Sequence, residues 1–247
     1  MNPLNQRVIL RNPRIVTLVL VMGLAASLAG ALVARRFQVK ATRARVEQEA
    51  VIAQENLHYT IQAYRDILLG FRGHSTAGLG LNRDRFHQYF ASLDLRTHHP
   101  GLLSVSYGVE IPGAGRDRAE RELRREMGDP AFAIHPPGLR PSYFVLLFAE
   151  PRASNRASIG RDTRTLPGQG LDIDRARDTG GLVLTGPMKV LQYDGPDPGL
   201  LMSLPLYHGA PATLEERRRS FLGCINGAFR VQELIAEALG KETLRKL

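Results

Sequence analysis

An apolar segment near the N-terminus constrains this chain more than any other feature of its sequence. Residues Ile15 to Ala34 read IVTLVLVMGLAASLAGALVA, twenty residues without a charge. At about 1.5 Å per residue, such a helix spans roughly 30 Å of hydrocarbon. We therefore predict a transmembrane helix over 15–34, preceded by a tail at 1–14. A cleaved signal peptide is the alternative, because Ala29 and Ala31 resemble a cleavage site, but the apolar region of such peptides usually has about 7 to 15 residues.

The basic residues of the chain gather around this segment. The formal net charge is +9, from 33 Lys and Arg and 24 Asp and Glu. Residues 1–45 hold eight of the basic residues and no acidic one, which leaves 25 basic and 24 acidic residues beyond them. Nucleic-acid binding requires clustered cations on the folded domain, so this function loses its main support and we expect no nucleic-acid partner.

The same charges conflict with a cytoplasmic N-terminus. Three basic residues precede the apolar segment and five follow it, up to Arg45. Because cytoplasmic flanks carry the excess of Lys and Arg, this count alone would place the N-terminus outside the cell.

Residues 35–70 are predicted to form a stalk helix, because helix formers dominate and neither Gly nor Pro occurs before Gly70. Its apolar positions alternate in steps of four and three, which fits an a/d heptad seam. They are Val46, Ala50, Ala53, Leu57, Thr60, Tyr64 and Ile67. The helix either packs this face on its own domain or forms a parallel homodimer, for which Ala and Thr make a weak seam.

Residues 71–240 alternate helices and strands, and 241–247 form a C-terminal tail. Apolar and β-branched runs predict strands at 102–111, 141–151, 181–191, 199–207 and 221–229. Helices are expected at 82–95, 115–128 and 231–240, with another before the last three strands. This order predicts an α+β domain with a largely antiparallel sheet, one face of which can hold a small ligand.

Catalytic signatures are absent from the sequence. It contains no G-x-x-x-x-G-K-[ST], G-x-S-x-G, H-E-x-x-H or C-x-x-C motif. His98 and His99 are neighbours, so their side chains would point apart and chelate poorly. Glu150 and Asp162 could act as paired carboxylates of an exported hydrolase, but nothing in the sequence places them together. We therefore expect no enzyme, no cofactor and no metal, and a buried, unpaired Cys224.

A series of motifs follows in order along residues 60–240. They are FRG at 71–73, F-x-x-Y-F at 86–90, PGLLSVSYG at 100–108, AEP at 149–151, Asn155, GRD at 160–162, RARDTGG at 175–181, LTGP at 184–187, Gln192, LPLY at 204–207 and ERRRSFLGCINGAFRVQELIAEAL at 216–239. The series resembles the CHASE domain, the extracytoplasmic sensing module of membrane histidine kinases, adenylate cyclases and diguanylate cyclases, including plant cytokinin receptors.

The resemblance implies a receptor input. In that family a membrane helix runs into a long extracytoplasmic helix that carries PAS-like subdomains, a small molecule binds the membrane-distal one, and the domain is usually a dimer. We therefore expect a single-pass protein of the inner membrane with a periplasmic, PAS-like sensor domain and a small-molecule ligand. This orientation opposes the charge count.

The resemblance also implies ligand contacts. A carboxylate in the G-x-D motif of cytokinin receptors grips the polar edge of the ligand, and Asp162 stands at that position. The L-T-x-P strand supplies contacts that correspond to Leu184 and Thr185, and the following turn adds polar groups near Gln192 and Asp194.

Several of these residues have alternative roles. Asp162 could cap the segment that follows it, and Thr185 could serve strand packing alone. Arg161 stands where the bacterial pattern is usually aromatic, which hints at an anionic ligand group. Arg175 and Arg177 are expected on a solvated helix face, with an anion contact as the alternative.

The sequence up to Leu247 shows neither a second membrane helix nor a kinase or cyclase domain. We expect such an output domain in a longer receptor or on a separate partner chain. A membrane-tethered structural or interaction protein without a ligand is the rival hypothesis.

Overall fold

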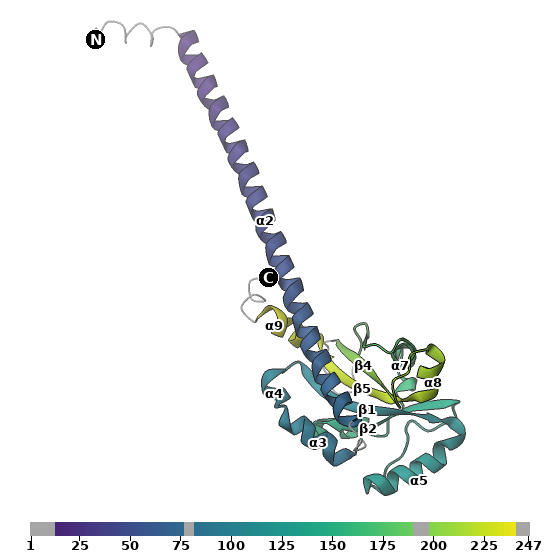
Figure 1. The fold of residues 1–247 in the computed structure, drawn as a ribbon. Coiled ribbons are helices and arrows are strands. Elements are labelled where there is room, and N and C mark those ends of the chain that lie inside the picture. Colours follow the sequence, from purple (N-terminus) through teal and green to yellow (C-terminus); the bar gives the residue numbers. More distant parts are fainter. Residues whose placement is uncertain (1–12, 77–81, 190–197, 241–247) are drawn as a thin grey trace. The chain divides into compact units, whose positions relative to one another are not determined.

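The computed structural model describes residues 13–76, 82–189 and 198–240 (Figure 1). The chain divides into two compact units, Met1–Glu55 and Asn56–Leu247. Helix α2 (Pro13–Thr76) contributes residues to both. Within the described ranges, α2 is the helix that is long and apolar enough to cross a membrane, with a mean hydropathy of 2.4 over its most apolar window and none of that window buried.

The second unit is built on a five-stranded antiparallel sheet in the order β2-β1-β5-β4-β3. Its strands are β1 (Leu102–Pro112), β2 (Ser142–Glu150), β3 (Val183–Leu184), β4 (Gly199–Tyr207) and β5 (Phe221–Arg230). Its further helices are α3 (Arg83–Ser92), α4 (Leu95–His98), α5 (Arg116–Met127), α6 (Arg152–Asn155), α7 (Gln169–Thr179), α8 (Leu214–Ser220) and α9 (Val231–Leu239), with 3-10 turns η1 (Gly113–Gly115), η2 (Arg156–Ser158) and η3 (Thr163–Thr165). The predicted α+β, PAS-like class is confirmed.

Several elements differ from the sequence predictions, among them one strand and one helix. The strand expected at 181–191 shortens to β3, followed by a single bridge between Met188 and Gly199, and its last two positions lie outside the described residues. Pro187 has no N–H to donate to a ladder, which favours an interruption there. Helix α8 was not predicted, although Thr213 and Glu216 form a capping box at its start.

Side-chain alternation along the strands divides the core into two. On β2, Val145 and Leu147 face the larger core, whereas Phe144 and Leu146 face the smaller one beside α7. The C-terminal part of α2 packs into the larger core through Tyr64, Leu68 and Phe71, each about 1% exposed. The i, i+4, i+7 spacing of these three residues places them on one helix face.

Part of the predicted stalk seam therefore packs on its own domain. Leu57 and Ile67 contact the larger core together with Tyr64, whereas Val46 lies in the first unit and is 58% exposed. The C-terminal part of the seam thus packs on its own domain, the first of the two predicted alternatives. The N-terminal part has no packing partner in the described single chain.

A glycine allows β1 and β5 to approach closely. Gly223 has a φ of +152°, and a Cβ added there would lie 2.0 Å from the carbonyl oxygen of Gly108. Only glycine fits this position, because any side chain would collide with backbone.

A polar contact joins α2, α9 and the segment before β1. The Tyr64 hydroxyl donates to Glu237 Oε2 at 2.5 Å, and His99 Nδ1 lies 2.9 Å from Glu237 Oε1. The ring of Tyr64 packs edge-on against Phe229 of β5, with centroids 4.4 Å apart. Burial, and then the hydrogen bond to Glu237, raise the pKa of Tyr64, so its hydroxyl stays protonated as a donor. We call Tyr64, His99 and Glu237 the Tyr64 junction.

We predict that Tyr64→Phe lowers the free energy of unfolding by about 1.5 to 3 kcal/mol, the usual contribution of a hydrogen bond to a charged group. The ring contacts remain, so the change isolates the hydroxyl. Denaturant unfolding measures the loss, and Tyr59→Phe is the control because Tyr59 is 71% exposed. Equal effects of the two substitutions would contradict a stabilising role for the junction.

Candidate functional site

A small cavity lies between α7 and the sheet. Its volume is about 30 Å³, and it is bounded by β1, β2, β4, β5, the residue after β3, the first residue of η3 and the first half of α7. The lining residues are Ser106, Phe144, Leu146, Thr163, Gln169, Asp172, Ile173, Thr185, Leu201, Ser203, Asn226 and Ala228. A cavity of this size holds about one or two water molecules, whereas sites for larger ligands have about 300 Å³ or more. Binding of a larger molecule therefore requires α7 or the lining side chains to move.

The polar side chains of this wall are buried and held by the sheet. Ser203 and Asn226 are cross-strand partners on β4 and β5, and the Ser203 hydroxyl donates to Asn226 Oδ1 at 2.8 Å. Thr185 Oγ1 accepts a hydrogen bond from the backbone N–H of Leu201 at 2.9 Å. Buried polar groups are favourable only when they are hydrogen-bonded, so these contacts fix the wall in place.

Only some of the predicted ligand-contact residues line the cavity. Thr185 lines the cavity, whereas Leu184 is 40% exposed and does not. Gln192 and Asp194 lie outside the described residues. Arg161 is half-buried and absent from the lining, and its backbone carbonyl accepts from the N–H of Leu146 on β2.

Asp162 is fully buried but also lies outside the cavity lining. Its Oδ1 accepts hydrogen bonds from the backbone N–H groups of Phe144 at 3.0 Å and Arg164 at 3.1 Å. Its Oδ2 lies 3.6 Å from Arg140 Nη1. Asp162 thus caps η3 and ties this turn to β2, which matches the alternative role of a capping residue.

Most of the polar residues that line the cavity were not predicted from the sequence. Ser106, Ser203 and Asn226 are polar positions inside otherwise apolar strands, and this departure from the pattern was the available signal. Asp172 gave no such signal, because an acid in the first turns of a helix is common for electrostatic reasons alone. Glu150 and Asp162 have separate partners, since Glu150 Oε1 lies 3.0 Å from His87 Nδ1. The described residues contain no group of three or more His, Cys, Asp and Glu side chains that could hold a metal.

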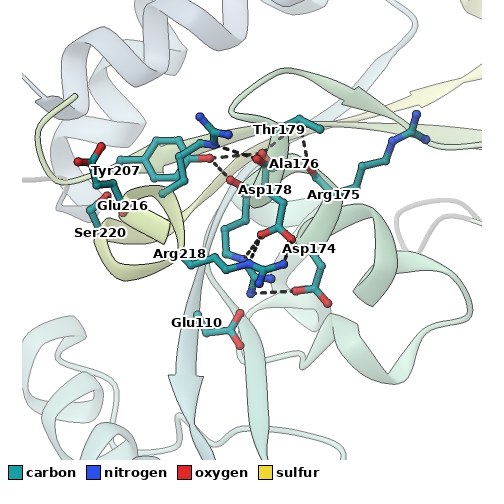
Figure 2. Close-up of polar contacts among 12 residues, drawn as sticks. Glu110, Asp174, Arg175, Ala176, Asp178, Thr179, Tyr207, Glu216, Arg218 and Ser220 are labelled. Atoms are coloured by element: carbon teal, nitrogen blue, oxygen red, sulfur yellow. Dashed lines mark hydrogen bonds and ion pairs between the residues drawn. The ribbon is translucent and has the colours of Figure 1, made fainter. Parts of the chain in front are cut away.

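Ion pairs fasten α7 to its surroundings. Arg164, in η3, bonds Glu110 of β1 at 2.7 Å and Asp174 of α7 at 2.8 Å. Arg177 of α7 lies 3.2 Å from Asp174 and 2.8 Å from Asp178. Figure 2 shows Asp178 facing Arg218 of α8, with the shorter of their two contacts at 2.5 Å. We call the six charged residues of this network the α7 clamp, and Arg177 in it is not the solvated residue that the sequence predicted.

The end of α7 is also held through its backbone (Figure 2). The Tyr207 hydroxyl donates to the carbonyl of Arg177, and Arg217 Nε donates to the carbonyl of Asp178 at 2.8 Å. Burial raises the pKa of Tyr207 to about 12, so the phenol stays protonated and can donate. Cys224, beneath the same region, is fully buried, and this burial raises the pKa of its thiol.

We predict that Asp178 contributes stability that disappears in acid. Hydrogen bonds from Arg218 and then Arg177 hold the pKa of Asp178 well below its usual range. A carboxyl group with a lowered folded-state pKa stabilises the fold above its unfolded pKa, about 3.9, and less as the pH falls below that value. Asp178→Asn should therefore be less stable than the unsubstituted protein at pH 7, and the difference should shrink between about pH 4 and pH 2.

Denaturant unfolding across this pH range measures the effect. Asp117→Asn on α5 is the control, because it makes the same chemical change at an exposed residue. A stability difference for Asp178→Asn that does not change with pH would contradict the prediction.

Among solved structures, the chain is similar to the ligand-binding domain of the amino-acid chemoreceptor PctC of Pseudomonas aeruginosa PAO1, in complex with GABA. The TM-score is 0.44 and the sequence identity 15%. The similarity covers 76% of this chain and 60% of that one, so the chain spans less than two thirds of its length.

A family model also matches the chain. Residues 80–247 match the CHASE domain, and this range includes all strands of the described sheet and the whole cavity lining. CHASE domains are extracellular sensor domains, and the match spans more than half of the chain. The chain therefore belongs to the CHASE domain family.

Proposed function

We propose that this chain is the input part of a membrane signal-transduction receptor and that a small molecule binds in the cavity beneath α7. The observation that carries the proposal is the cavity itself, where Ser106, Ser203 and Asn226 place buried polar groups on a sheet face covered by a single helix. Buried polar side chains around a cavity are typical of small-molecule sites, in which a few polar groups fix the ligand's orientation.

Strand β5 connects this cavity with α2 and α9, the first and last helices of the domain in sequence. Asn226 and Ala228 line the cavity, while Phe229, on the opposite face of the same strand, contacts Tyr64 of α2. Glu237 of α9 binds the same tyrosine. A ligand that displaces β5 or α7 would thus change the packing of α2 and α9, by an amount that its differential affinity for the two states limits.

The output would come from a histidine kinase or nucleotide cyclase domain, in a longer chain or on a separate partner. A homodimer through the N-terminal part of the stalk would carry the signal. Val46 supports this, because this seam residue is 58% exposed in the single chain. Thr185 remains a proposed ligand contact, with Asp162 in a positioning role because it holds η3 on β2.

We predict that Ala228→Leu abolishes ligand binding. Three additional carbon atoms would fill a cavity of about 30 Å³ at a residue that is 2% exposed. The measurement is thermal stabilisation of the full chain against a library of small metabolites, because a ligand that binds the native state raises the unfolding temperature. Compounds that stabilise the unsubstituted chain should not stabilise the variant.

The control is Ala91→Leu, at an exposed position of α3. Stabilisation that survives in Ala228→Leu would place the ligand elsewhere. If no compound stabilises the unsubstituted chain, the sensor hypothesis fails and a tethered interaction protein without a ligand is favoured.

We also predict that the domain lies in the periplasm, anchored in the inner membrane by residues 15–34. A reporter enzyme that is active only in the periplasm, fused after residue 45, should be active, because CHASE domains are extracellular. Activity of the matched cytoplasmic reporter at the same site would reverse the orientation, as the distribution of basic residues suggests.

A further inference from the structure

The cavity contains one ionisable side chain. Of the lining residues in the described part of the chain, only Asp172 carries a charge, and the other polar groups are hydroxyls and amides. Asp172 lies in the first half of α7 and is half-buried. A partly desolvated carboxylate is favourable when a donor or a cation faces it.

The neighbouring cations already have carboxylate partners. Arg164 faces both Glu110 and Asp174, and Arg177 faces Asp174 and Asp178. No hydrogen bond or ion pair joins the Asp172 side chain to another described residue. Among the described residues, no cation forms an ion pair with the Asp172 carboxylate, so its charge attracts a cation and repels an anion.

We propose that the cavity binds a small molecule through a protonated amine that faces Asp172. This inference rests on the proposed function and specifies its ligand class. The amine would donate to the carboxylate, while Ser203, Asn226 and Gln169 offer hydroxyl and amide groups to the remainder of the ligand. A carboxylate or phosphate ligand would be buried beside a negative charge with no cation in the lining, which is strongly unfavourable.

This assignment differs from the expectation based on Arg161. That residue suggested an anionic ligand group, but its side chain is not part of the lining. The carboxylate of the G-x-D motif, Asp162, is likewise absent from the lining, and its Oδ1 accepts from the backbone N–H groups of Phe144 and Arg164. Asp172 is thus the carboxylate that a ligand in the cavity would meet.

A purely structural role for Asp172 makes a different prediction. An acid near the start of α7 interacts favourably with the helix dipole, whatever occupies the cavity. In that case Asp172→Asn would lower stability slightly and leave ligand selection unchanged. A binding role requires the substitution to change which ligands bind.

The experiment uses three series of probes that differ at one end only. Ethanolamine, ethylene glycol and glycolate have nearly the same size and place an ammonium, a hydroxyl and a carboxylate at the same point, and each is extended to chains of three and four carbons. Thermal stabilisation and calorimetry of the full chain in detergent measure binding. We expect the amine series to bind most tightly, and Asp172→Asn to weaken that series by about tenfold or more, the range of a charged hydrogen bond.

Two matched variants serve as controls. Glu215→Gln removes the same charge from a side chain that is 88% exposed on α8, and should leave amine binding unchanged. Asp172→Glu keeps the charge and should retain the preference for amines. Unliganded unfolding temperatures of all variants separate loss of binding from loss of folding.

Several outcomes would overturn the amine assignment. One is tighter binding of the hydroxy acids than of the amines, and another is equal amine binding by Asp172→Asn and the unsubstituted chain. If none of the three series binds, the amine assignment fails as well. The proposed sensor function fails separately, only if no compound of the wider metabolite library stabilises the unsubstituted chain.

Discussion

The alternation of side chains along β5 is the constraint on which the rest of the domain depends. Successive residues of a strand point to opposite faces, so Asn226 and Ala228 reach the cavity while Ile225 and Phe229 enter the larger core. A shift of one residue in register would exchange these two sets and place Asn226 in the apolar core. The close approach of β1 and β5 at Gly223 permits this register, because a side chain there would meet the backbone of β1. The same strand therefore determines both the lining of the cavity and the packing of α2 in the larger core.

The two carboxylates that could bind a ligand, Asp162 and Asp172, differ in how deeply they are buried. Asp162 is fully buried, and its Oδ1 accepts two backbone hydrogen bonds that hold η3 on β2. Its Oδ2 has no hydrogen-bond partner among the described residues and lies 3.6 Å from Arg140 Nη1. An ion in such a place is stabilised by these donors and by the nearby cation. Asp172 is half-buried at the wall of the cavity, where solvent or a ligand can supply the donor instead. Position in a motif therefore identified a buried carboxylate that holds η3 on β2, and the geometry of α7 identified one that lines the cavity.

Sequence patterns predicted most of the elements and fewer of the site residues. Apolar runs and helix formers were sufficient for α2, α9 and the long strands, because periodicity reports burial directly. The strand predicted at 181–191 was too long, since propensity alone did not account for the interruption near Pro187. Thr185 was predicted from its motif and lines the cavity, while Asp172 was missed. Which face of α7 meets the sheet depends on contacts with Ile173 and Ala176 that are distant in sequence from the strands they touch, and no local pattern specifies them.

The contacts that hold α7 suggest why this element, rather than the sheet, would respond to a ligand. The sheet is held by backbone ladders, whereas α7 rests on a few apolar side chains, the α7 clamp and the hydrogen bonds that Tyr207 and Arg217 donate to carbonyls near its end. Several clamp residues are partly exposed, with Arg218 at 55% and Asp174 at 37%, and such ion pairs each contribute only about 0 to 1 kcal/mol. A tenfold difference in ligand affinity between two positions of α7 corresponds to about 1.4 kcal/mol, which is comparable to one or two of these pairs. A weakly fastened helix above a nearly closed cavity can therefore be displaced by a modest binding energy, and the rigid β5 beneath it would transmit the displacement to Tyr64.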